Sequence, residues 1–461
     1  MCFSLLGGEN GEQAALTMLE VSRYGLFETE LLALLSRKDM SRDWAVIYRN
    51  IKQLLRPCGN LGDGRLDFYH RSLSKAVRKV FLGVGNTDDT IKKDIYDHWH
   101  RVLADFFADC TDLNRKAEEM PYHLEQLADD EGLVKCLVDW EIFECLYDDH
   151  FAVELIRFWK AAGGYKKAAV VYKESLSALR EQLTTVLDDN ERKITSKMEF
   201  AAIQYKVANF LRVGGEVGQA YELMKECVAI EEEEGAGEGA GEGVLHLAQV
   251  CHWMAYCKRT MQYTDATKEQ KIEGYEEAVR IYKKSNDYLL KVPGEESDVL
   301  QGRNNCGMAH VMLKIAQEKG VDGSDEFLNE TLPLIDSSVD VLEKYNEIRY
   351  LIDALGTQSQ IYPKFEEKKA IRVRAIDLAL RTFGEVHDLF VSKSRNYGTM
   401  VSKAGDYDSA YYWYDRSYAA ALKLYGADHS YTKLIERHLQ EPNIVAAQTK
   451  LEEGGEKNEK C

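Results

Sequence analysis

The sequence FGEVH at residues 383–387 returns as YGADH at residues 425–429, 42 positions later. Between the two copies, GDYDSA at residues 405–410 separates two segments of helical length. Its glycine can take the left-handed conformation that ends a helix, and its tyrosine can begin the next helix. Two helices in a repeat of this length indicate a stack of helical hairpins.

The second helix of this repeat carries a stripe of apolar residues at steps of three and four, which is typical of one buried helix face. The stripe consists of Tyr407, Ala410, Tyr411, Tyr414, Tyr418, Leu422 and Tyr425. A single hairpin cannot bury that face, so we expect neighbouring hairpins to cover it.

Similar glycine-to-alanine segments come earlier in the chain. They are GGYKKA at 163–168, GEVGQA at 215–220 and the weaker GYEEA at 274–278, and PKFEEK at 363–368 keeps only the aromatic residue. Their unequal spacing indicates loops of different lengths. We therefore predict roughly five or six irregular helix pairs over residues 150–440, with a capping helix and disordered tail at 441–461.

The glycine-histidine junction, the GDYDSA turn and the two helices around it resemble the tetratricopeptide repeat of the kinesin light chain type. The resemblance implies an all-α solenoid whose concave groove binds an extended or helical peptide of a protein partner. Candidate peptide-binding side chains lie on first helices of the better hairpins, nine and two positions before the cap glycine or one turn between. There they could clamp a peptide backbone or carboxylate. They are Lys206, Asn209, Asn396 and Lys403. The alternative for each is a solvated helix face.

Residues 12–82 predict a small module of three helices, a β-hairpin turning at GDG (62–64) and a further helix. This order is that of a winged helix. Residues 36–101 hold 14 Lys or Arg against 8 Asp or Glu, and Arg49 and Lys52 would be exposed on the third helix. A DNA-binding module is one interpretation, and a packing module with a solvated basic face is the one we favour.

Residues 94–160 predict a helical spacer in which Pro121 interrupts the helices. Residues 14–160 resemble the winged helix and spacer of nephrocystin-type STAND signalling ATPases, which lead into tetratricopeptide repeats. The matching segments are RYGL (23–26), FYHRSL (68–73), HWHRVLA (98–104), MPYHL (120–124), LVDWEIF (137–143) and ELIRFW (154–159). The resemblance implies protein partners in a ciliary complex.

The sequence contains no GxxxxGK[ST] motif, which in those ATPases cradles the nucleotide phosphates. We therefore expect a non-enzymatic scaffold without catalytic residues or cofactor, either a fragment of a larger ATPase or a paralogue that kept only spacer and repeats. The alternatives are a regulatory part of a STAND nucleotide switch, with His70 as a vestigial sensor, and, less favoured, a DNA-binding regulator. A hairpin-end histidine bonded to backbone is the simpler interpretation of His70.

Other candidate chemistry is weak. His98 and His100 are two residues apart, which places them on different faces of a helix, so we expect no metal site. The run EEEEGAGEGAGEG at 231–243 predicts a solvated loop, with an acidic docking site as the alternative.

Composition narrows the class of protein. The formal net charge of −18 argues against nucleic acid or anionic membrane as partner of the whole surface. The 10 cysteines form no CxxC pair, which is typical of reduced thiols. No apolar stretch is long enough to span a membrane. We expect a cytoplasmic protein, with its oligomeric state and its partner left open.

Overall fold

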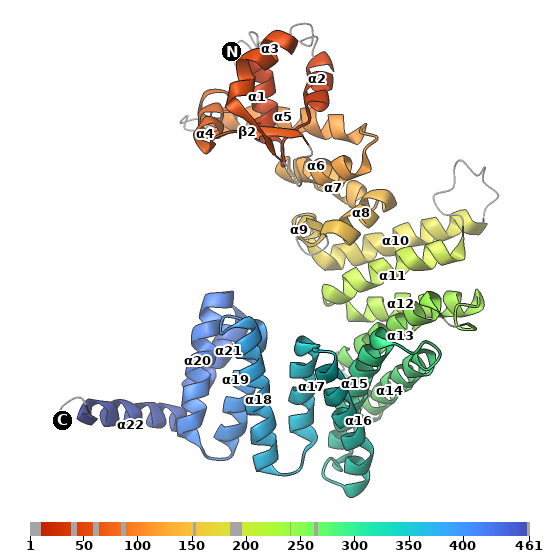
Figure 1. Cartoon of the computed structure of the whole chain (residues 1–461), viewed down its shortest axis with the longest axis vertical. Helices are drawn as coiled ribbons and strands as arrows, with labels where there is room; N and C mark the ends of the chain where they lie inside the picture. The colour runs from red at the N-terminus through yellow and green to blue at the C-terminus, as the bar shows by residue number, and fades with distance from the viewer. Residues whose placement is uncertain are drawn as a thin grey trace. The chain divides into compact units, whose positions relative to one another are not determined.

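The computed structural model describes residues 11–37, 44–58, 64–83, 89–150, 154–184, 196–239, 241–261 and 266–458. Residues 62 and 63 of the predicted hairpin turn, and the last three residues of the predicted tail, lie outside these ranges. Helices dominate, and the chain forms two compact units, Met1–Glu216 and Val217–Cys461. Figure 1 shows the elements of each unit.

The first unit begins with the predicted three helices, hairpin and helix. These elements are α1 (Gly11–Val21), α2 (Glu28–Arg37), α3 (Trp44–Ile51) with a 3-10 turn (Lys52–Leu54), β1 (Leu55–Cys58), β2 (Arg65–Phe68) and α4 (Arg71–Val80). The strands pair antiparallel with Leu55 opposite Phe68. His70 caps α4, because its Nδ1 accepts from the Ser72 amide at 3.1 Å. The backbone-bonded interpretation of His70 is therefore the one found.

The core of this module extends into the next helix. α5 (Asp89–Ala108) contributes Trp99, Leu103 and Phe107 to the apolar cluster around α1, α2 and the hairpin. The rest of the unit consists of α6 (Leu113–Gln126), α7 (Asp130–Leu137), α8 (Trp140–His150), α9 (Ile156–Ala161), α10 (Gly164–Thr184) and α11 (Lys197–Val213). The expectation for Pro121 was wrong, because Pro121 lies inside α6 and is buried there.

A buried arginine ties α6 to the N-terminal module. Arg115 donates from Nε to Glu30 Oε1 at 2.8 Å and from NH2 to the Gly25 carbonyl at 3.1 Å. Glu119, one turn further along α6, accepts from the Arg23 amide at 2.9 Å. Because both α6 side chains are buried, these charged hydrogen bonds hold α6 against the start of α2 and the residues just before it.

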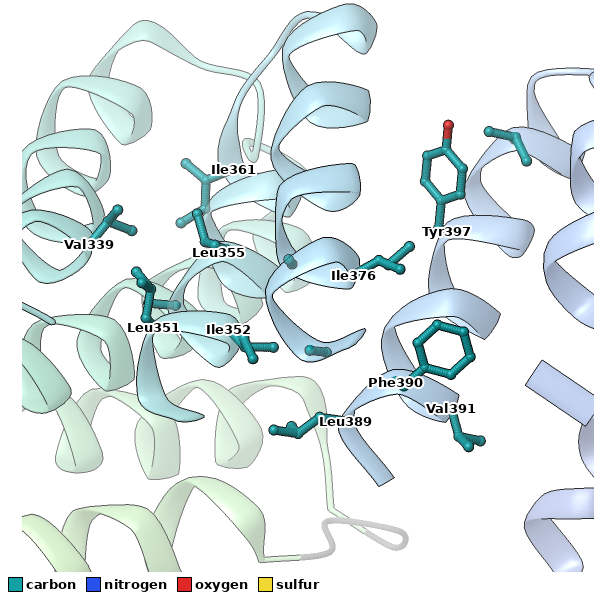
Figure 2. Close-up of a cluster of buried hydrophobic side chains, with 14 of the residues drawn as sticks. Val339, Leu351, Ile352, Leu355, Ile361, Ile376, Leu389, Phe390, Val391 and Tyr397 are labelled. Carbon is teal, nitrogen blue, oxygen red and sulfur yellow. The ribbon is translucent and has the colours of Figure 1, made fainter. Parts of the chain in front are cut away.

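The second unit is a succession of helices in which each packs against the next. They are α12 (Val217–Glu233), α13 (Glu242–Thr260), α14 (Lys268–Leu289), α15 (Glu295–Lys319), α16 (Asp325–Lys344), α17 (Ile348–Ile361), α18 (Phe365–Phe383), α19 (Asp388–Lys403), α20 (Tyr407–Tyr425), α21 (Ser430–Leu439) and α22 (Pro442–Asn458). Helix pairs stacked on their neighbours make this an all-α solenoid of the tetratricopeptide-repeat type, as predicted. Figure 2 shows side chains of α16 to α19 meeting in its core.

The repeated glycine-histidine junction has a structural explanation. Gly384 and Gly426 have φ values of 82° and 83°, which favour glycine. His387 then caps α19 by accepting from the Leu389 amide at 3.2 Å, and its ring stacks on Phe383. His429 repeats the arrangement at the start of α21. The motif therefore ends one hairpin and starts the next.

Two expectations for this unit need correction. Leu422, assigned to the buried stripe of α20, is 41% exposed, whereas Tyr414 is buried. The acidic run at 231–243 is not simply a solvated loop. Glu231 is buried within reach of His246, and Lys291 Nζ donates to the Gly237 carbonyl at 2.7 Å. Contacts from α13 and from the residue two positions after α14 therefore hold Glu231 and Gly237 in place.

Candidate functional site

A cavity of about 340 Å³ lies on the first helices of successive hairpins in the second unit. Its lining comes from α13, α15, α17 and α19, with two residues from α18. The main side chains are Tyr256, Arg259, Cys306, His310, Asp353, Thr357, Arg372, Lys393 and Asn396. These helices belong to different hairpins, so the site exists only because the hairpins stack.

The lining follows from helical periodicity. On α15, Arg303 and His310 are seven residues apart and therefore share one face. The Arg303 guanidinium lies over the Tyr350 ring of α17 at 4.1 Å and over the Trp253 ring of α13 at 5.1 Å. The face of α15 that lines the cavity therefore also contacts α13 and α17, about two turns towards the start of α15.

Two arginines bring positive charge to the cavity. Arg259 and Arg372 form no ion pair with any carboxylate in the described part of the chain. Arg372 donates from NH1 to the Asn396 carbonyl at 2.6 Å, while its Nε is buried without a partner. Burial lowers the pKa of the Arg372 guanidinium from its ordinary value. A partly desolvated arginine without a counter-ion is a site for an anion.

A third cation is held in place by an acidic neighbour. Lys393 Nζ lies 2.7 Å from Asp353 Oδ1 across α17 and α19. Gly356 makes room for it, because a Cβ there would stand 3.1 Å from Lys393 Nζ. Asp353 is the single carboxylate in the lining, so Arg259, Arg372 and Lys393 leave a positive balance.

Burial and the same positive charge lower the pKa values of two neighbouring basic groups. Burial first, and then the charges of Arg259 and Lys314, lower the pKa of His310 to about 3. Burial and Arg259 also lower the pKa of the Lys314 ammonium. An anion bound here would offset a repulsion that the chain otherwise carries.

Cys306 completes one wall of the cavity. Its thiol lies 3.8 Å from Thr357 Oγ1, and burial raises its pKa. A raised pKa keeps the sulfur in the weakly nucleophilic thiol form. Cys306 therefore adds no negative charge to the cavity, and the positive balance of the lining favours an anionic group.

The predicted peptide-binding residues are not brought together at this cavity. Asn396 lines it, whereas Lys403 is exposed in the last turn of α19 and is absent from the lining. Lys206 and Asn209 lie in the first unit, where they already have partners on α8. Lys206 Nζ lies 3.0 Å from Glu144 and 2.9 Å from Asp148, and Asn209 Nδ2 donates to the Tyr147 hydroxyl at 2.6 Å.

Sequence reasoning missed Arg259, His310 and Arg372. The loops between helices differ in length, so these residues cannot be aligned with Asn396 by counting back from a glycine. Arg372 also lies on α18, a second helix, where binding residues were not expected. The sequence did contain one signal for these arginines. Neither Arg259 nor Arg372 has an acidic residue three or four positions away on its own helix.

The other titratable motifs lie elsewhere. His98 is exposed and His100 is buried on the opposite side of α5, with His100 Nδ1 2.8 Å from His123 Nδ1. No cluster of three or more metal-binding side chains occurs among the described residues. In the same part of the chain, no helix has the length and apolar character needed to cross a membrane.

Comparison with known proteins gives relatives that contain the same repeat. The chain is 25% identical over 239 residues to tetratricopeptide repeat protein 41 of Mus musculus, covering 45% of the chain and 18% of that protein. It is 35% identical over 97 residues to a TPR repeat-containing protein of Dictyostelium discoideum, covering 21% of the chain and 5% of that protein. The chain therefore spans a small part of the length of either relative.

No protein-family model matches the chain. Among solved structures, a STAND protein with a tetratricopeptide repeat sensor from Pyrococcus horikoshii covers 91% of the chain and is itself 64% covered, at 13% identity and a TM-score of 0.25. A circular tandem repeat protein covers 96% and is 97% covered, at 13% identity and a TM-score of 0.23. Likenesses this weak carry no conclusion about function. The chain is thus similar in sequence to segments of two proteins named for tetratricopeptide repeats, and its second unit is a stack of helical hairpins.

Proposed function

We propose that the chain is a protein-interaction scaffold whose second unit binds an extended acidic peptide segment of a partner. The observation that carries the proposal is the cavity on α13, α15, α17 and α19, where Arg259 and Arg372 form no ion pair with a carboxylate of the residues that the structure describes. An extended peptide laid across first helices would meet these arginines in turn. The relatives named above, which share the repeat, support the same class of function.

The ligand group follows from the chemistry of the lining. Guanidinium groups donate paired hydrogen bonds to carboxylates, and the Arg372 Nε lacks an acceptor. The amide of Asn396 and the hydroxyl of Thr357 can bond to peptide backbone. A side-chain or terminal carboxylate with neighbouring peptide groups therefore fits best.

A titration with a short labelled peptide that ends in acidic residues and a free carboxylate tests the proposal. Arg259→Gln with Arg372→Gln should weaken binding by about tenfold or more, since each charged hydrogen bond contributes roughly 1.5 to 3 kcal/mol. Lys403→Gln with Lys423→Gln is the matched control, because it also removes two positive charges, on α19 and α20 outside the cavity. Equal weakening by both variants would show that only net charge matters.

The narrower form of the proposal concerns the partner. The resemblance of residues 14–160 to nephrocystin-type STAND proteins supports a partner in a ciliary complex. Proximity labelling in ciliated cells, with the Arg259→Gln, Arg372→Gln variant as control, should enrich ciliary proteins with the wild type alone. Equal labelling by both chains would remove the link between this cavity and such a complex.

A further inference from the structure

The proposed function does not use a second cavity, of about 720 Å³, that lies in the first unit. It opens between the end of α1, the β-hairpin and α4, beside α6. Its charged lining residues are Arg23, Arg56, Arg65, Arg71, Arg78, Glu20, Asp67 and Glu118. The cavity is a basic site in an acidic chain, because five arginines line it while the net charge of the chain is −18.

One wall is a single face of the β-hairpin. Arg56 is opposite Asp67 and Cys58 is opposite Arg65 in the strand register, and all four line the cavity. Residues directly opposite each other on paired strands share a face. The hairpin thus presents two arginines and one aspartate to the cavity.

The facing wall is one side of α4. Arg71, Ser74 and Arg78 line the cavity at spacings of three and four, which places them on one helix face. Arg71 is the first residue of α4, where the helix dipole disfavours a cation. A bound anion would reverse that local penalty.

Most of the charges in the cavity are already paired. Arg23 lies 2.8 Å from Glu154 and Arg65 lies 2.8 Å from Glu118, while Arg78 pairs with Glu20. The same oxygen of Glu118, Oε2, also accepts from Arg115 NH1 at 2.8 Å. These pairs make the walls rigid and leave little charge on the lining glutamates.

Arg56 and Arg71 are different. Both are exposed at the cavity, and neither forms an ion pair with any residue that the structure describes. They stand on opposite walls, one on β1 and one on α4. Tyr69, which is 68% exposed, lies between these elements in the chain and adds an apolar ring to the rim.

We propose that this cavity is a second binding site, which takes an anionic side chain of a protein partner between Arg56 and Arg71. The recognised group is a carboxylate or a phosphate on an extended segment. A concave cavity admits such a side chain, whereas a DNA duplex or a bilayer surface requires a protruding helix or a flat basic face. This site is separate from the cavity in the second unit and does not depend on it.

The test uses the full chain carrying Arg259→Gln and Arg372→Gln, so that the other cavity does not contribute. The probes are a labelled, C-terminally amidated peptide of alternating glutamate and glycine, and the same peptide with phosphoserine at its centre. Arg56→Glu with Arg71→Glu should weaken binding by about tenfold or more. Circular dichroism checks folding, which Arg71→Glu should preserve because an acidic residue suits a helix N-terminus.

The matched control is Lys52→Glu with Lys75→Glu, which makes the same change of net charge on the 3-10 turn after α3 and on α4, outside the cavity. Unchanged binding by this control, with loss in the arginine variant, supports the site. Tighter binding of the phosphopeptide would identify phosphate as the preferred group, and equal binding would identify carboxylate. Equal effects of the two double variants, no binding of either peptide at low ionic strength, or competition by duplex DNA or anionic vesicles would overturn the proposal.

Discussion

Tyr172 shows how one side chain holds several helices together. It is fully buried on α10, its hydroxyl accepts from Trp159 Nε1 at 2.9 Å, and it donates to the Leu137 carbonyl at 3.1 Å. Its ring also packs against Trp140 and Phe143. One residue thereby connects α7, α8, α9 and α10.

Removing only that hydroxyl should be costly. Tyr172→Phe leaves a buried indole N–H and a buried carbonyl without partners, so we expect a loss of about 1 to 3 kcal/mol. Urea unfolding followed by tryptophan fluorescence measures it, because Trp140 and Trp159 lie beside the ring. Tyr69→Phe, at an exposed position, should stay within about 0.5 kcal/mol of the wild type. Similar small effects of both changes would contradict the role assigned to Tyr172.

His100 gives the first unit a dependence on pH. Burial, and then the nearby His123, lower the pKa of His100 to about 3, and Tyr96, Tyr122 and Glu119 are its other titratable neighbours. The unfolded chain therefore binds a proton below about pH 6.5 that the folded chain does not bind. Stability should fall as pH falls from about 6.5 towards 3.

Between pH 6.5 and 5, His100 alone should account for a loss of about 2 kcal/mol. This window lies above the ordinary titration of carboxylates, so the lowered pKa of Glu119 adds its own loss only at lower pH. His100→Gln should reduce the slope of the stability profile across the window, as measured by urea unfolding at several pH values, while the slope that His310 contributes through its own lowered pKa remains. His98→Gln, on the exposed side of α5, is the control. Equal slopes in wild type and His100→Gln would contradict the assignment.

Helix α20 shows how a hairpin depends on the helices next to it. Tyr414 is buried, its hydroxyl donates to Thr399 Oγ1 at 3.1 Å, and its ring stacks on His438 of α21. Gly398 of α19 allows this approach, because a Cβ there would stand 3.0 Å from the Tyr414 ring. The ring therefore contacts the helices before and after its own.

Tyr414→Ala should cost about 3 to 5 kcal/mol and act locally. Hydrogen exchange should speed up in α19 to α22 and stay unchanged in α1 to α9. Tyr412→Ala, on the same helix but 51% exposed, should change little. Faster exchange throughout the chain would indicate one cooperative globule.

The sequence predicted the repeats well where the physical signal is local. Gly405 has the expected left-handed φ of 87°, and Asp406 caps α20 by accepting from the Ser409 amide. By contrast, α16 begins at a Ser324 cap without the glycine-to-alanine pattern, so its hairpin had no signature to find. Local caps can be read from the sequence, whereas an unmarked hairpin is visible only through its packing.

The candidate site was predicted less well, for a related reason. Asn396 was selected by its distance from a glycine in its own hairpin, and it does line the cavity. Arg259 and Arg372 reach the same cavity from other hairpins, and their meeting depends on loop lengths and stacking. Lys206 was selected by its distance from Gly215 in the same way, but Glu144 and Asp148 of α8 neutralise it. Long-range pairs of this kind leave no mark in a single sequence.

In the whole molecule, both units contain a cavity whose lining has more arginines than carboxylates. The two cavities are built from different elements. In the first unit the arginines come from a hairpin and α4, and in the second they come from stacked repeat helices. Both proposals assign an anionic protein segment to the cavity. A chain with a net charge of −18 would repel such segments elsewhere on its surface, so the two cavities should confer selectivity.

Hydrogen exchange of the full chain, with and without the free-carboxylate peptide at saturation, tests whether one peptide binds across the stacked helices. Binding at the cavity around Arg259 and Arg372 should slow exchange in α13, α15, α17 and α19 together, because the peptide would bridge them. The amidated peptide should protect these helices less. Protection confined to other helices, or identical protection in the Arg259→Gln, Arg372→Gln variant, would contradict the account.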